Sequence, residues 1–198
     1  MTKVDIRVLP VGELQANCYF LNAQGSDKAV IVDPGDDADL IKRALASLNL
    51  VPECILLTHG HYDHMLSAAH LKNEFGLKVC IHEKDAVYLT DRSYNLCPDQ
   101  DAERFLPISP DGLIPEGDFE VCGIHFTVIP TPGHTPGGVC LYLENQKTLI
   151  SGDTCFQTAS GAPILRAATG LRFAGRSKRC LRFRPKPLYT PATAQARR

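Results

Sequence analysis

Four side chains of metal-ligand type lie within six residues in the stretch Thr58-His59-Gly60-His61-Tyr62-Asp63-His64. The apolar run at residues 54–57 precedes it and predicts a buried strand. We expect an extended turn after that strand, in which alternate side chains such as His59 and His61 point the same way, toward one metal ion. Asp63 and His64 would begin the next helix and could face a second ion. Imidazole and carboxylate are ligands that zinc accepts. Three of the chain's seven histidines at this spacing therefore indicate a metal site rather than a chance cluster on the surface.

Two further polar clusters also follow apolar runs. The first is Thr131-Pro132-Gly133-His134-Thr135-Pro136-Gly137-Gly138, in which proline and glycine predict a tight turn that aims the histidine. The second is Ser151-Gly152-Asp153-Thr154. Taken singly, His134 has the pattern of an exposed loop histidine and Asp153 that of a turn or cap residue.

The apolar pattern predicts an α/β layered fold. Strands are expected at residues 18–21, 29–32, 54–57, 78–81, 124–129, 139–143 and 148–150, after a first half-buried strand within residues 1–10. Helical spacing is found at residues 36–48 and, less cleanly, at 64–75. Strands near the start followed by alternating strands and helices imply sheets covered by helices, and the His, Asp and Thr clusters lie where strands end.

Composition indicates an ordinary globular chain with one unusual end. The 198 residues, 44% of them hydrophobic, suffice for one domain, placed at residues 1–160. No stretch resembles a signal peptide or approaches the roughly 18 apolar residues of a membrane helix, so we expect a cytoplasmic protein without membrane partners. The eight scattered cysteines are expected to be free thiols, mostly buried. We expect His70, His82 and His125, in apolar or helical stretches, to be structural.

The three polar clusters, in this order and at these separations, resemble the metallo-β-lactamase superfamily. Asn17-Cys18-Tyr19 and Val32-Asp33-Pro34-Gly35 fit the family as well, so the resemblance covers about residues 4–160. It implies an αββα sandwich with the metal site at one edge of the paired sheets. It also implies the following roles: His59, His61 and His134 bind a first ion, Asp63 and His64 bind a second, Asp153 bridges them, Asp63 is also the catalytic residue, and Asp33 supports the ligands.

Within the superfamily the chain looks most like glyoxalase II. That resemblance implies one or two zinc ions, with iron or manganese as alternatives, and a small thioester such as a hydroxyacyl-glutathione as substrate. The ion lowers the pKa of water to about 7, which yields hydroxide for attack on a carbonyl, and a thiolate leaves without a strong general acid. Two alternatives stay open: a metal-binding pseudoenzyme with a defective second site, and an iron-dependent enzyme like the persulfide dioxygenases. The sequence does not indicate an oligomeric state.

The C-terminal part departs from the family. Residues 161–198 hold 10 Lys and Arg and no Asp or Glu, whereas residues 1–160 carry a formal net charge of −11. No histidine follows His134, although the family ends on a Tyr-Pro-Gly-His-Gly turn that completes the second metal site. We expect this atypical tail to be poorly ordered, because it lacks apolar periodicity. A basic stretch is often merely solvated, so nucleic-acid binding is not expected.

A frameshift explains this ending. Allowed codons for residues 188–198, translated in a shifted frame, give V-Y-P-G-H-G-P-G-T-T, which contains the missing turn. The same offset applied to residues 161–169 gives another family-like segment. One insertion or deletion near residues 157–161 is therefore our hypothesis for both differences.

Overall fold

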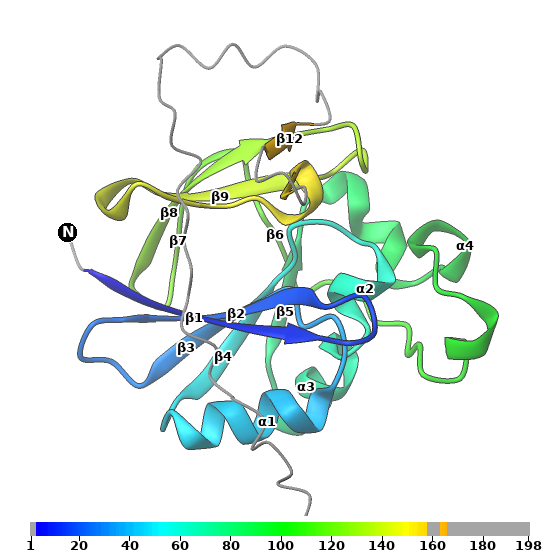
Figure 1. Ribbon diagram of the computed structural model, residues 1–198, viewed down its shortest axis with the longest axis horizontal. Helices are drawn as coiled ribbons and strands as arrows, with labels where there is room; N and C mark the ends of the chain where they lie inside the picture. The colour runs from blue at the N-terminus through cyan, green and yellow to red at the C-terminus, as the bar shows by residue number, and fades with distance from the viewer. Residues whose placement is uncertain (1–2, 158–162, 166–198) are drawn as a thin grey trace, which may run out of the picture.

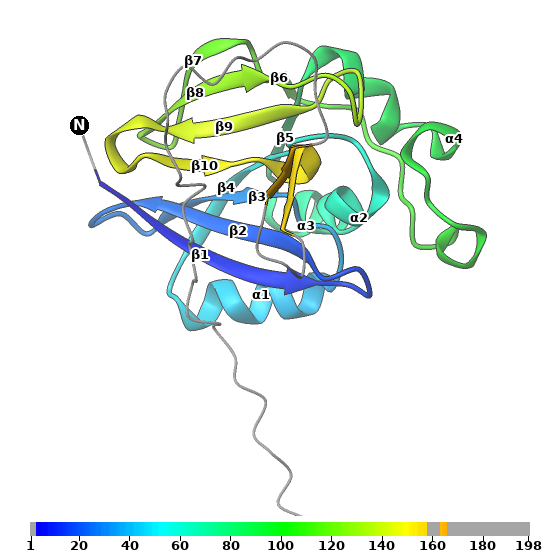
Figure 2. The same cartoon turned by 45° about the horizontal axis from the view of Figure 1, so that its top comes forward.

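The computed structural model describes residues 3–157 and 163–165, and its two main sheets face each other (Figures 1 and 2). The first sheet has the order β1-β2-β3-β4-β5-β6. Its strands are β1 (Val4–Val11), β2 (Ala16–Ala23), β3 (Lys28–Val32), β4 (Val51–Leu56), β5 (Lys78–Ile81) and β6 (Gly112–Leu113). The second sheet has the order β10-β9-β8-β7 and consists of β7 (Gly117–Val121), β8 (Ile124–Pro130), β9 (Val139–Leu143) and β10 (Thr148–Ile150).

The direction of the strands changes within the first sheet. β1, β2 and β3 pair antiparallel, and β3, β4, β5 and β6 pair parallel. Parallel neighbours need long crossovers, which here contain α1 (Ala38–Ser47) between β3 and β4 and α3 (Ala68–Phe75) between β4 and β5. The carboxyl ends of these parallel strands lie at one edge of the sheet, where ligands bind in open α/β sheets.

The core has two parts, one on each face of the first sheet. Between the two sheets, buried residues such as Leu21, Val32 and Leu56 pack with Phe126 and Leu141 from the second sheet. On the other face, residues including Phe20, Ile31 and Ile55 pack with Ile41 of α1 and Leu71 of α3. Alternate residues of β3 and β4 therefore enter different cores, which explains the continuous apolar runs at residues 29–32 and 54–57.

The described layers match the expected αββα sandwich except for its second helical layer. Helices cover one face of the first sheet, and the second sheet covers the other (Figure 2). The outer face of the second sheet carries exposed side chains, among them Glu120, His125 and Leu149. The described residues thus build three layers of the αββα sandwich, and the C-terminal portion of the fold is incomplete within them.

Shorter elements complete the described chain. They are α2 (Tyr62–Met65), α4 (Arg92–Asn95), the 3₁₀ helices η1 (Glu83–Leu89), η2 (Asp99–Asp101), η3 (Glu144–Gln146) and η4 (Gly152–Thr154), and the strand pair β11 (Cys155–Gln157) with β12 (Pro163–Leu165). The expected domain boundary at residue 160 and most of the expected poorly ordered tail lie outside the described residues. In that tail the structure describes only β12.

One expected helix is two. The prediction of a single helix over residues 64–75 was wrong, because α2 ends at Met65 and α3 begins at Ala68. Between them the backbone N–H of Ser67 donates to the carbonyl oxygen of Pro34, 3.0 Å away, in place of a helical partner. This contact holds the start of α3 against the turn that follows β3.

The cysteines whose side chains the structure describes are all free. They number six, and Cys18, Cys54, Cys97 and Cys140 among them are buried. Across the described segments, every helix is too short or too polar to cross a lipid bilayer.

Candidate metal centre

Three chain segments that follow strands meet at one edge of the two sheets. They are residues 58–64 after β4, residues 131–138 after β8 and residues 151–154 after β10. One backbone hydrogen bond links the first two: Val139 N, directly after the second segment, donates to the carbonyl of Thr58 (2.9 Å). A second, from Thr131 N to the carbonyl of Gly138 (2.8 Å), lies within the second segment. The second closes the Pro- and Gly-rich turn predicted from the sequence. Segments far apart in sequence are thereby brought to one site.

Three histidines form one donor group at this edge. The ligand nitrogens of His59, His61 and His134 all lie within 4.8 Å of one another. His61 Nδ1 is 2.8 Å from His134 Nε2, and the His59 ring centroid lies 4.9 Å and 5.0 Å from those of the other two. Three nitrogens converging in this way match the donor set of a catalytic zinc site.

His59 is prepared to act as a metal ligand. Its ring is buried and its Nε2 atom has no hydrogen-bond partner among the described residues. Its Nδ1 lies 3.2 Å from the hydroxyl oxygen of Thr58, which itself donates to Asp33 and can therefore accept the Nδ1 proton. Burial, and then the charges of His64, His61 and His134, hold its pKa well below the ordinary value. The neutral ring thus presents a lone pair at Nε2, and a bound cation satisfies that buried atom.

A second donor group overlaps the first. Ligand atoms of His59, His64 and Asp153 also lie within 4.8 Å of one another. His64 Nε2 is 3.2 Å from Asp153 Oδ1 and 3.6 Å from Asp63 Oδ2, while the other oxygen of Asp153 lies 3.4 Å from His134 Nε2. Asp153 therefore stands between the two groups, with one oxygen toward each.

The electrostatics of this second group favour a positive charge. Burial opposes a proton on His64, but hydrogen bonds to Asp153 and Asp33, together with the charges of Asp33 and Asp63, raise its pKa to about 10. Burial also opposes charge on Asp153, and the hydrogen bond to His64 with the charges of three histidines lowers the pKa of that carboxyl. A divalent cation is a larger positive charge in the same place. The residues therefore fit a metal ion.

Asp33 holds the second group in position. It is fully buried, with a backbone φ of 52°, and follows β3. Its Oδ1 accepts the Thr58 N–H (2.7 Å), and its Oδ2 accepts the Thr58 hydroxyl (2.6 Å) and lies 3.0 Å from His64 Nδ1. A carboxylate on the distal nitrogen fixes the orientation of a metal-binding imidazole. This is the supporting role expected for Asp33.

The structure brings all six expected ligand residues to one place, and it adds neighbours that the sequence did not indicate. The sequence pattern did not indicate Thr58, Asp85 or Tyr88. Thr58 lies within the quoted stretch, whereas no local sequence pattern marks Asp85, a buried residue of η1. The other histidines lie apart. His70 and His125 are exposed, so the structural interpretation of these two was wrong, whereas the His82 Nδ1 accepts the Lys84 N–H (3.3 Å) at the start of η1.

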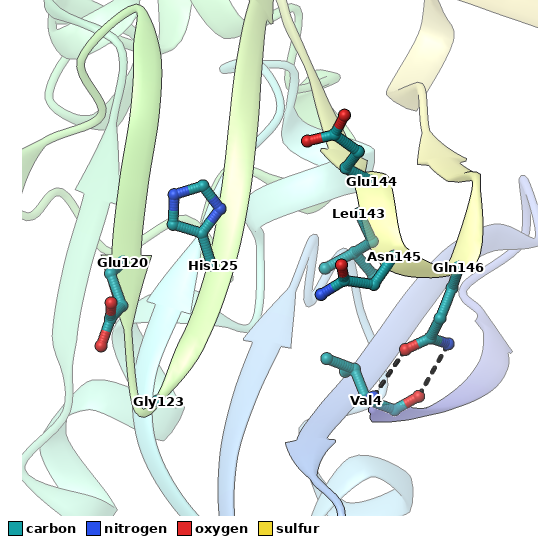
Figure 3. A pocket seen from close by; sticks show the side chains of 8 residues that line it. All are labelled: Val4, Glu120, Gly123, His125, Leu143, Glu144, Asn145 and Gln146. Atoms are coloured by element: carbon teal, nitrogen blue, oxygen red, sulfur yellow. Dashed lines mark hydrogen bonds between the residues drawn. The ribbon is translucent and has the colours of Figure 1, made fainter. Parts of the chain in front are cut away.

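A cavity of about 270 Å³ lies elsewhere on the molecule (Figure 3). It is lined by Gly123 in the turn before β8 and Leu143 at the end of β9, whereas the metal ligands lie beyond the opposite ends of these strands. Gln146 exchanges hydrogen bonds of 2.6 Å and 2.9 Å with the backbone of Val4 there. This cavity is separate from the donor groups and includes no grouping of metal ligands.

Comparisons with known proteins identify the family of the chain. The family model "Metallo-beta-lactamase superfamily" matches residues 11–189, which extends past the expected limit at residue 160. A probable metallo-hydrolase of Bacillus subtilis, YqgX, is 33% identical over 156 residues, covering 78% of this chain and 73% of its own. The hydroxyacylglutathione hydrolase GloC of Haemophilus influenzae is 32% identical over 166 residues, covering 80% and 75%.

A solved structure shows the same fold. The BLEG-1 B3 metallo-beta-lactamase superposes with a TM-score of 0.68 at 34% identity, covering 77% of this chain and 74% of its own. The family match over most of the sequence and these relatives together show that the chain belongs to the metallo-beta-lactamase superfamily.

Proposed function

We propose that this chain is a metal-dependent thioesterase that hydrolyses a small thioester such as a hydroxyacyl-glutathione. One observation carries the proposal: two groups of metal-ligand side chains lie side by side and share His59. His59 is buried, and its Nε2 has no hydrogen-bond partner among the described residues. The name of the GloC relative supports the choice of substrate. We take zinc as the ion, with iron and manganese as alternatives for the same His and Asp ligands.

We propose the division of ligands that the resemblance implies. His59, His61 and His134 would hold one ion, and His64 and Asp63 would hold another, with Asp153 beside both. When bound, such ions lower the pKa of water to about 7 and polarise a carbonyl oxygen. The second position lacks the family's last histidine in this sequence. We therefore propose that the second ion binds more weakly than the first.

The chain's own residues position the reactants. The side chains of His134 and Asp153 are 32% and 24% exposed, so a substrate approaches the donor groups from their side. Asp63 is 20% exposed beside a small groove, also lined by Tyr62 and Arg104, from which water reaches it. We propose that Asp63 orients this water and takes its proton. A thiol has a pKa near 8.5, so the thiolate leaves without a proton donor.

The experiment compares substrates at fixed metal content. The purified chain, loaded with zinc, iron or manganese, is given a hydroxyacyl-glutathione and, separately, a chromogenic cephalosporin, because the BLEG-1 likeness suggests β-lactam hydrolysis as the second candidate. We expect release of glutathione, and its loss in His59→Ala. Cephalosporin turnover that exceeds thioester turnover would replace the proposal with the second candidate. Firm metal binding with neither activity would instead identify a pseudoenzyme, and oxygen uptake with a persulfide in the iron form would identify a dioxygenase.

A further inference from the structure

We propose that Asp85, which is outside both donor groups, is a positioning residue that fixes the spacing between the two loops carrying His59, His61 and His134. The inference rests on the metal-binding part of the proposed function and is independent of the thioester substrate. It concerns η1, the 3₁₀ helix at Glu83–Leu89, which follows β5 and packs behind the histidines.

The Asp85 carboxylate joins the two loops directly. Its Oδ2 accepts the backbone N–H of Gly60 (3.2 Å) and the hydroxyl of Thr135 (2.6 Å), and its Oδ1 accepts the backbone N–H of Gly137 (2.6 Å). Gly60 stands between His59 and His61 in the sequence, and Thr135 directly follows His134. The Asp85 side chain is therefore hydrogen-bonded to residues that are the direct sequence neighbours of His59, His61 and His134.

η1 packs closely against both histidine loops. A Cβ atom added at Gly137 would lie 2.7 Å from both the backbone nitrogen and Oδ1 of Asp85. One added at Gly60 would lie 2.3 Å from Cβ of Tyr88, which is also in η1. Since real Cβ atoms do not approach so closely, η1 can pack this tightly against both loops only because each has a glycine at the point of contact.

The chemistry of the three donors favours a carboxylate over any neutral replacement. Asp85 is fully buried, and a buried charge is costly unless it is well hydrogen-bonded. Its three partners are two backbone N–H groups and a hydroxyl, all of which donate. A carboxylate is an acceptor at both oxygens, whereas an asparagine amide must direct an NH₂ toward one of these donors. The aspartate offsets this cost because it accepts from both loops at once.

The test uses Co²⁺ as the probe, because its visible absorption reports ligand geometry. The full chain, Asp85→Asn and Thr135→Val are titrated with Co²⁺ after chelation. We expect Asp85→Asn to bind 10- to 100-fold more weakly, as is typical for residues that orient metal ligands, and to show a changed spectrum. Thr135→Val removes one donor with little change in shape and should weaken binding less. Adding it to Asp85→Asn should have little further effect, since both act through one contact.

Asp111→Asn is the matched control. Asp111 is a surface carboxylate whose side chain is 34% exposed, and it accepts from Lys72 Nζ (2.5 Å) and Val79 N (2.9 Å), away from the donor groups. It should lower the melting temperature without altering Co²⁺ affinity or spectrum. If Asp85→Asn behaves like this control, or if it misfolds and Thr135→Val binds Co²⁺ as the unaltered chain does, the inference is overturned. Absence of Co²⁺ binding in the unaltered chain would instead overturn the metal-binding proposal on which it rests.

Discussion

His61 Nδ1 lies 2.8 Å from His134 Nε2, although 73 residues separate the two in sequence. Two imidazole nitrogens at this distance either share a proton or direct two lone pairs at a common cation. Burial, and then the charge of His134, lower the pKa of His61 and so disfavour the protonated form. The pair therefore has the arrangement of two ligands of one metal ion.

Loss of a single histidine from the first group should release the metal. We expect His59→Ala and His134→Ala each to retain well below one equivalent after gel filtration, because two protein ligands do not hold the ion firmly. Elemental analysis by mass spectrometry measures this. His125→Ala is the control, since His125 is exposed at the start of β8, at the opposite end of the strand from His134. Equal metal content in all four proteins would refute the ligand assignment.

Metal removal should lower thermal stability. An ion present at about 100 times its dissociation constant stabilises the folded state by about 2.7 kcal/mol. For a chain of this size, that corresponds to a melting temperature higher by about 5–10 °C. Differential scanning calorimetry with and without chelator should show this difference in the unaltered chain and little of it in His59→Ala. A chelator effect of the same size in both proteins would mean that the ion binds elsewhere.

Asp33→Asn should lower both the stability of the fold and the metal affinity of the second donor group. The amide cannot accept from all three groups that now face the carboxylate, namely the Thr58 N–H, the Thr58 hydroxyl and His64 Nδ1. Each buried donor left without a partner costs about 1–3 kcal/mol. Urea unfolding in chelator measures the loss of stability, and a metal titration should show a 10- to 100-fold weaker site. Unchanged values of both would show that Asp33 does not orient His64.

A chain with the reading frame restored should be the better enzyme. Restoring the frame near residues 157–161 returns a histidine to the second site, and a second bound ion supplies several kcal/mol of transition-state stabilisation. We expect two metal equivalents and much faster hydroxyacyl-glutathione hydrolysis than in the present chain at saturating metal. A frame-restored His59→Ala variant controls for hydrolysis without metal. Equal turnover in the two chains would show that the missing histidine is dispensable, and resequencing the gene across codons 155–165 tests the frameshift itself.

The sequence by itself determined much of the sandwich and indicated the six residues that the structure brings together as candidate ligands. The bounds predicted at residues 78–81, 139–143 and 148–150 are those of β5, β9 and β10. Short apolar runs next to polar or turn residues identify these strands. The candidate ligands have a similar local signal: His59, His61, Asp63 and His64 lie close together in sequence, just after a strand. β2, β3 and β4 begin earlier than expected, and in β4 a register shift accommodates Pro52.

The tertiary structure alone decided how those ligands are held. The break between α2 and α3 depends on the carbonyl of Pro34, and the spacing of the histidine loops depends on Asp85, which is 25 residues from Gly60 and 52 from Gly137. Neither partner leaves a periodic or local signal. A hydrogen bond between distant segments requires only that the fold bring one donor and one acceptor together, so the sequence around Asp85 resembles any polar helix start until the chain has folded around it.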